Sequence, residues 1–144
     1  RKNGEIKWLE QKDCSFVYRD SRFKYNDEII LAAEFKMEKG DRGEIEEKLK
    51  ENLGKRKSQP KEPSAGSIFI NPKPKSAGEL IENCGLKGQQ IGGAKISEIH
   101  ANFIVNTGGA KAVDVVALIN FAKEKVTEKF NIDLKEEIVR VGEF

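Results

Sequence analysis

The chain has 144 residues, of which 38% are hydrophobic and 35% charged, a balance typical of a folded, soluble domain. Its formal net charge is only +2, and the basic run at 55–57 follows mixed charges such as Lys50 and Glu51, which argues against a nucleic-acid-binding surface. Every apolar run is far shorter than a membrane span requires. Cys14 and Cys84 are too few for a disulfide framework, and with one histidine they make no convincing metal site. We therefore expect a cytoplasmic protein that binds no metal and no nucleic acid.

Two strands are predicted in the first third of the chain, over residues 6–9 and 28–37. The segment between them, 16–23, is irregular in pattern and dense in aromatic and cationic side chains. Three isoleucine or leucine residues spaced four apart then predict a helix over 44–53, and Gly54 is expected to end it.

A basic, proline-containing connector covers residues 55–63 and is the best candidate for a domain boundary. A short apolar run at 67–70 follows and predicts a buried strand. Ala65 and Gly66 precede it, and such small residues allow another molecule to approach the backbone closely. Ser67 therefore stands where a ligand has access, although a loop leading into a buried strand explains the same pattern without any ligand.

The rest of the chain mixes helices and strands, which predicts a small α+β or α/β domain from Gln59 onward. Helix boundaries are clear, because Ser76 is a good N-cap and Gly85 a good stop signal. The expected elements are a helix from Ser76 to Cys84, a loop-rich stretch from Gly85 to Lys95, a strand over 103–105, a helix over 112–130 and a strand over 138–141.

Several segments occur in an order and spacing that together are specific, although no single motif is decisive. They are 18–23 (YRDSRF), 63–69 (PSAGSIF), 80–82, 85–88, 91–94, 102–106 and 134–142. This ordered set resembles the UDP-N-acetylenolpyruvoylglucosamine reductase family, flavoenzymes that make UDP-N-acetylmuramate for peptidoglycan. The short path from Phe23 to the connector resembles the second structural type of that family.

The resemblance implies a domain organisation in which this chain is the C-terminal half of the enzyme. Residues 1–58 would contribute the last strands and helix of an FAD-binding domain, and 59–131 would form the substrate-binding domain. That domain is expected to be a small mixed sheet with helices packed on it, while 132–144 form a tail returning to the flavin domain. The resemblance also implies that most FAD contacts lie outside residues 1–144, that these residues alone are inactive, and that the full-length enzyme is a monomer.

The family reaction implies specific catalytic roles. NADPH reduces FAD, a hydride passes to the enolpyruvyl double bond of UDP-N-acetylglucosamine enolpyruvate, and a proton is added at the neighbouring carbon. By position, Ser67 resembles the proton donor, and Arg19 and Glu137 resemble the groups that hold and polarise the substrate carboxylate. The residues alone leave other readings open: Arg19 could neutralise Asp20, and Glu137, beside Glu136, could belong to a solvated charged run.

Five further residues resemble substrate contacts of the family: Tyr18, Asn71, Lys87, His100 and Lys57. Each has an ordinary structural reading as well, since a tyrosine packs in cores and a lone histidine before an apolar strand is commonly structural. Lys57 is a departure from the family pattern, because relatives commonly carry a lysine where this chain has Ser58. Either Lys57 replaces that lysine or the contact is absent.

A second function class fits the same residues. A nucleotide-sugar binding module without catalysis of its own would keep the UDP contacts and need no flavin. Retention of Ser67, Arg19 and Glu137 favours the oxidoreductase for the whole protein.

Overall fold

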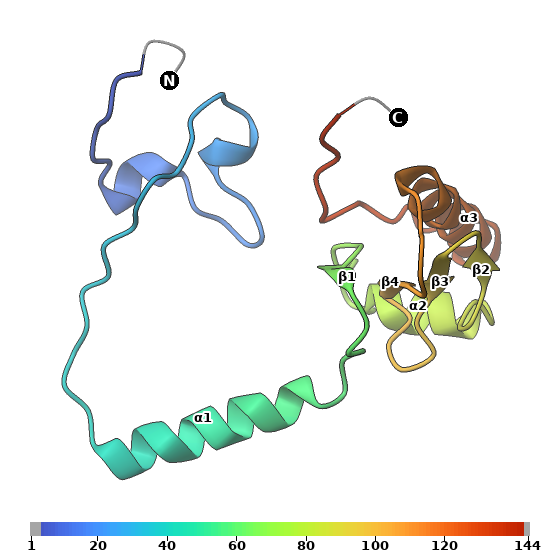
Figure 1. Ribbon diagram of the computed structural model, residues 1–144, viewed down its shortest axis with the longest axis horizontal. Helices are drawn as coiled ribbons and strands as arrows, with labels where there is room; N and C mark the ends of the chain where they lie inside the picture. The colour runs from blue at the N-terminus through green and yellow to red at the C-terminus, as the bar shows by residue number, and fades with distance from the viewer. Residues whose placement is uncertain (1–3, 143–144) are drawn as a thin grey trace. The chain divides into compact units, whose positions relative to one another are not determined.

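The computed structural model describes residues 4–142, and the chain divides into two compact units, Arg1–Ile45 and Glu46–Phe144 (Figure 1). We refer to them as the first and second units. Helix α1 (Arg42–Arg56) crosses the division between them. Among the described residues, no helix is long and apolar enough to cross a membrane.

The first unit is mostly irregular, with two short 3₁₀ helices, η1 (Gln11–Cys14) and η2 (Arg22–Lys24). The strands expected over residues 6–9 and 28–37 are wrong, because both segments are irregular. A strand needs a neighbouring strand to satisfy its backbone N–H and C=O groups. Between residues 4 and 45, the structure contains only an isolated bridge of two residues, from Val17 to Asp20, so neither segment has a partner.

Helix α1 confirms the helix expected over 44–53, but it continues through Gly54 to Arg56, so the expected end is wrong. Asp41 caps the start, since its Oδ1 accepts a hydrogen bond from the N–H of Glu44 at 3.1 Å. A glycine inside a helix lowers the stability of the helix by about 1 kcal/mol relative to alanine. Favourable interactions in the surrounding turns can offset this loss. One such contribution is the ion pair between Lys55 and Glu51, one turn apart at 2.6 Å.

The second unit is built on a four-stranded sheet with strand order β1-β4-β3-β2, and each pairing is antiparallel. The expected small sheet with packed helices is confirmed. The strand expected over 103–105 is confirmed, whereas the loop-rich reading of 85–95 missed a short hairpin. The strands are β1 (Ser64–Ser67), β2 (Gln90–Ile91), β3 (Ala94–Ile96) and β4 (Phe103–Asn106).

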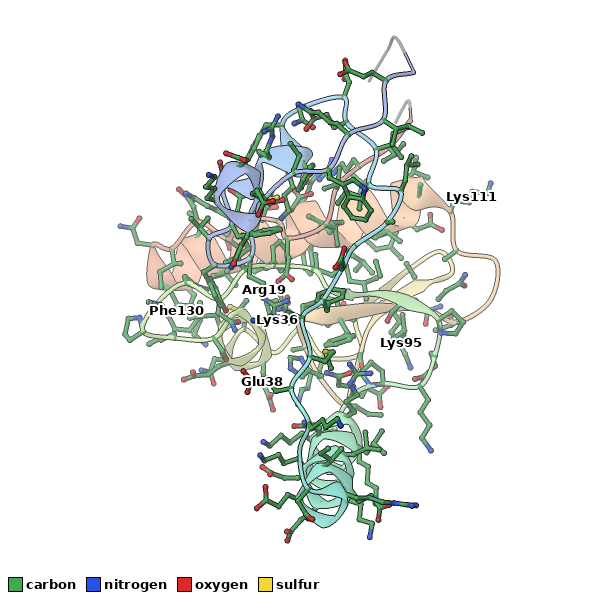
Figure 2. The ribbon with its side chains drawn as sticks, turned by 90° about the vertical axis from the view of Figure 1, so that its left-hand side faces the viewer. Arg19, Lys36, Glu38, Lys95, Lys111 and Phe130 are labelled. Atoms are coloured by element: carbon green, nitrogen blue, oxygen red, sulfur yellow. The ribbon has the colours of Figure 1, made fainter. Side chains whose placement is uncertain are left out.

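Two further helices, α2 (Ala77–Asn83) and α3 (Ala112–Phe130), enclose the core of the second unit. Both expected helices are confirmed, and the Ser76 hydroxyl accepts the N–H of Glu79 at 3.2 Å, as its N-cap role predicts. Helix α3 packs against β2, β3 and α2. Figure 2 labels Lys111 and Phe130 at its two ends. The largest fully buried side chains are those of Ile68, Phe69, Leu80, Ile81, Ile96, Val105, Leu118, Ile119 and Val126.

The C-terminal tail, residues 131–142, runs along the segment that follows β1. The strand expected over 138–141 is wrong, since the tail pairs at one earlier point, the antiparallel bridge between Phe69 and Glu136. Two backbone hydrogen bonds flank this bridge, from Ile70 N–H to Lys135 O at 2.9 Å and from Glu137 N–H to Ile68 O at 2.8 Å. The pairing stops there because residues 138–142 have no further strand to bond.

Gly93, in the turn between β2 and β3, sits against the backbone of the loop before α3. A Cβ at this position would lie 2.4 Å from the backbone nitrogen of Ala110 and 2.6 Å from the carbonyl oxygen of Gly108. We expect Gly93→Ala to lower the free energy of unfolding by about 2–3 kcal/mol, because neither backbone can yield easily. Urea denaturation followed by circular dichroism measures the change.

Gly54→Ala is the matched control, because a Cβ on Gly54 meets no atom within 4 Å and the residue lies inside helix α1. It should stabilise by up to about 1 kcal/mol. Equal effects of the two substitutions would contradict the steric explanation.

Candidate active site

Ser67 ends strand β1, where the backbone departs from regular pairing. It lies opposite Phe103 of β4, and the register shifts between Ser64 and Ser67. Gly66 has φ +82°, a left-handed conformation that favours glycine, and a Cβ there would meet no atom within 4 Å. An irregularity of this kind re-aims the side chain that follows it. The half-buried Ser67 hydroxyl therefore stands beside an open backbone, as a group that acts on a ligand requires.

Asn102 holds the segment after Ser67 in place, and the sequence reasoning did not single it out. This asparagine is 3% exposed. Its Oδ1 accepts the Phe69 N–H at 2.9 Å and its Nδ2 donates to the Phe69 carbonyl at 2.8 Å. Its own carbonyl accepts the Ile68 N–H at 2.9 Å. The available signal was a lone amide inside the apolar run 101–105, since a buried amide needs hydrogen-bond partners.

Glu137 approaches the same segment from its other side. The N–H of Glu137 donates to the carbonyl of Ile68, the residue directly after Ser67, at 2.8 Å. Two of the three residues predicted to be catalytic are thus brought together through one backbone hydrogen bond, although they are far apart in the sequence. The roles of Ser67 and Glu137 in catalysis stay a prediction.

Glu136 contacts different partners from its neighbour Glu137. Its carboxylate accepts hydrogen bonds from Lys123 Nζ at 2.5 Å, Arg140 Nη2 at 2.8 Å and Arg140 Nε at 3.0 Å. Burial by itself raises the pKa of Glu136, but the hydrogen bonds and charges of Lys123 and Arg140 outweigh it and hold the pKa below its ordinary value. Glu136 is therefore a charged anchor between α3 and the tail, a role that the sequence analysis did not assign to it.

Arg19 and Tyr18 belong to the first unit. Arg19 has φ +59°, which is uncommon for a residue with a side chain and costs on the order of 1 kcal/mol or more. The turn is closed by two backbone hydrogen bonds between Val17 and Asp20, at 3.0 and 3.2 Å. The Arg19 guanidinium, labelled in Figure 2, lies 5.9 Å from the centroid of the Tyr18 ring. The Asp20 carboxylate accepts the hydroxyl of Tyr25 at 2.8 Å, which raises the pKa of Tyr25.

The predicted UDP contacts have structural partners within the second unit. Asn71 Oδ1 accepts the N–H of Ala77 at 3.0 Å and so helps to begin α2. Lys87 forms an ion pair with Glu82 at 2.7 Å. Lys57 is exposed directly after α1. The contacts of Asn71 and Lys87 account for these two residues without a ligand, and the roles of all three residues in substrate binding stay predictions.

His100 also has a structural position. Its Nδ1 accepts the N–H of Asn102 at 3.2 Å, and its ring meets the Phe103 ring edge-on with centroids 4.9 Å apart. It lines an open pocket at the start of α2 together with Ser76, Glu79 and Glu82. Over residues 4–142, histidine, cysteine and acidic side chains form no group of three or more that could hold a metal ion.

The four-stranded antiparallel sheet, its two packed helices and the tail beside Ser67 define the second unit as a small α+β domain. A family model described as "UDP-N-acetylenolpyruvoylglucosamine reductase, C-terminal domain" matches residues 59–141, more than half of the chain. The chain belongs to the UDP-N-acetylenolpyruvoylglucosamine reductase family, which confirms the resemblance.

Individual relatives agree with this assignment. The reductase of Halalkalibacterium halodurans is 46% identical over 143 residues, which cover 98% of this chain and 48% of the relative. That of Carboxydothermus hydrogenoformans is 48% identical over 142 residues, covering 97% and 47% of the two chains. The crystal structure of the reductase from Thermus caldophilus matches with a TM-score of 0.71 and 37% identity, covering 88% of this chain and 45% of that one. The chain thus spans about half the length of these relatives.

Proposed function

We propose that the protein carrying this chain reduces UDP-N-acetylglucosamine enolpyruvate to UDP-N-acetylmuramate, with NADPH and FAD, in the cytoplasm. The observation that carries the proposal is the family match over residues 59–141. The position of Glu137 beside Ile68, next to Ser67, supports it, because the resemblance assigns both residues to one substrate group. The product is a precursor of peptidoglycan.

FAD is the proposed cofactor and would supply the hydride when bound. The residues of this chain do not fit the whole group by themselves. Tyr18 is 67% exposed, and among the described residues of the first unit the buried hydrophobic core holds only Cys14. Such a surface does not enclose an isoalloxazine ring. We assign most FAD contacts to the half of the relatives' length that this chain does not match.

The residues of this chain would supply the proton and hold the substrate. Reduction of the double bond forms one C–H bond from the hydride and a second from a proton. Ser67 would donate that proton, and its alkoxide would regain one from water. A serine suffices because the adduct formed by hydride addition is a strongly basic, carboxylate-stabilised carbanion. Arg19 would pair with the substrate carboxylate through its planar guanidinium, and Glu137 would help only when protonated or paired with a cation.

A hybrid enzyme tests the proposal. In it, this chain replaces the matching 143 residues of the Halalkalibacterium halodurans relative, which is 46% identical there. We expect NADPH oxidation that depends on UDP-N-acetylglucosamine enolpyruvate, measured by absorbance. UDP-N-acetylglucosamine, which lacks the enolpyruvyl group, is the control substrate and should support no turnover.

The alternative, a nucleotide-sugar binding module, predicts a different result. The hybrid would bind UDP-sugars and FAD in calorimetry yet oxidise no NADPH in response to the enolpyruvyl substrate. That combination would overturn the proposed reaction.

A further inference from the structure

The Lys123–Glu136–Arg140 cluster joins helix α3 to the C-terminal tail. The Glu136 side chain is 17% exposed, and Lys123 and Arg140 are each 35% exposed, so the cluster is shielded more than a typical surface ion pair. Arg140 binds both oxygens of the carboxylate, through Nε and Nη2. Charge-assisted bonds of this geometry are stronger than neutral ones and restrict the carboxylate to one position.

The cluster acts on a segment in which two glutamates are adjacent. In extended backbone, successive side chains point to opposite sides, so Glu136 and Glu137 face in different directions from the tail. Glu136 is directly opposite Phe69, and Glu137 bonds Ile68. A slip by one residue would exchange the two carboxylates, because the side-chain period along a strand is two. Two backbone hydrogen bonds flank the bridge. Because so short a pairing could also form with the tail shifted by one residue, the backbone alone specifies this register weakly.

We propose that Glu136 is a positioning residue whose ion pairs with Lys123 and Arg140 select the register of the tail, so that Glu137 and no other carboxylate lies beside the Ser67 segment. Lys123 supplies the reference point, because it projects from the helix packed on the sheet and not from the tail. The inference rests on the proposed function in one respect, the assignment of Glu137 to the substrate carboxylate.

The stabilising contribution of the Glu136 ion pairs should be lost as the pH falls. Burial raises the pKa of Glu136, but Lys123 and Arg140 together lower it by more, so that it lies below its ordinary value of 4.5. A carboxylate whose pKa is lower in the folded state contributes full stability above its unfolded-state pKa. That contribution is lost as the pH falls through the lower, folded-state value. Lys123 of α3 and Arg140 of the tail are the charged groups that face Glu136.

Amide hydrogen exchange on the full chain tests the anchor directly. In Glu136→Gln and in Lys123→Met, the Ile70 and Glu137 amides, whose hydrogen bonds join the tail to residues 68–70, should exchange about 10–100-fold faster. The Ile68 and Phe69 amides bond Asn102 instead and should keep their protection. Glu128→Gln is the matched control, since it removes another carboxylate paired with a lysine of α3, at 2.7 Å from Lys125. Unchanged exchange at Ile70 and Glu137 in the two test variants would overturn the proposal.

A double-mutant cycle in the hybrid enzyme separates positioning from general stability. Glu136→Gln should lower kcat/KM at least tenfold, but less than twofold when Glu137 is already glutamine. Equal losses in both backgrounds would show that Glu136 does not act through Glu137. If Glu137→Gln alone leaves kcat/KM unchanged while the exchange results hold, the role proposed for Glu137 fails and the tail anchor stands.

Discussion

Ser67→Ala in the hybrid enzyme is expected to slow reduction of the enolpyruvyl substrate by about 10²–10⁴-fold, the usual loss when a general acid is removed. Reduction of FAD by NADPH should change little, because that step takes no proton from this hydroxyl. Substrate affinity should also change little, since the hydroxyl is a small part of the contacts that the resemblance implies. Stopped-flow absorbance at the flavin band measures the two steps separately.

Two variants make this test specific. Ser67→Cys should recover part of the rate, because a thiol can also donate a proton. Ser64→Ala is the matched control on the same strand, and it removes a hydroxyl that accepts the Gly66 N–H at 3.4 Å. If Ser67→Ala slows both steps equally, Ser67 is structural, and Glu137 becomes the next candidate for the acid.

Asn102→Ala is expected to lower the free energy of unfolding by about 2–5 kcal/mol. The substitution leaves the N–H and the carbonyl of Phe69 without their partners, in a residue that is only 2% exposed. Each unsatisfied buried polar group costs about 1–3 kcal/mol. Urea denaturation of the full chain, followed by circular dichroism, measures the loss.

Asn106→Ala is the matched control for Asn102. Asn106 Oδ1 also accepts two backbone N–H groups, those of Gly108 and Ala110, at 2.9 and 3.2 Å. These groups are exposed, so water replaces the lost partner and the cost should stay at about 0.5–1.5 kcal/mol. Similar losses in the two variants would show that burial is not the cause.

The elements that were predicted correctly are those whose formation depends on residues close together in the sequence. The helix over 112–130 has a long apolar face and the observed α3 has the same bounds. Ser76 caps α2 through a residue three positions away. The strands expected over 6–9 and 28–37 have apolar residues in the right numbers, yet 78% of Ile6 and 76% of Phe35 are exposed. A segment of strand-like composition forms a strand only when a partner strand lies beside it.

The sequence by itself therefore determined the family and the helices of the second unit, because periodicity, capping and ordered motifs are local properties. The buried strand expected over 67–70 is wrong, since β1 covers Ser64–Ser67 and the buried residues Ile68 and Phe69 follow it. The tertiary structure decided which polar groups hold the segment after Ser67 in place and how Glu136 and Glu137 lie along that segment. Asn102 bonds Phe69 across 33 residues and Lys123 bonds Glu136 across 13. Contacts at such separations form only when the chain folds. The resemblance singled out Glu137 by its position, but no local pattern shows that Glu136 pairs with Lys123.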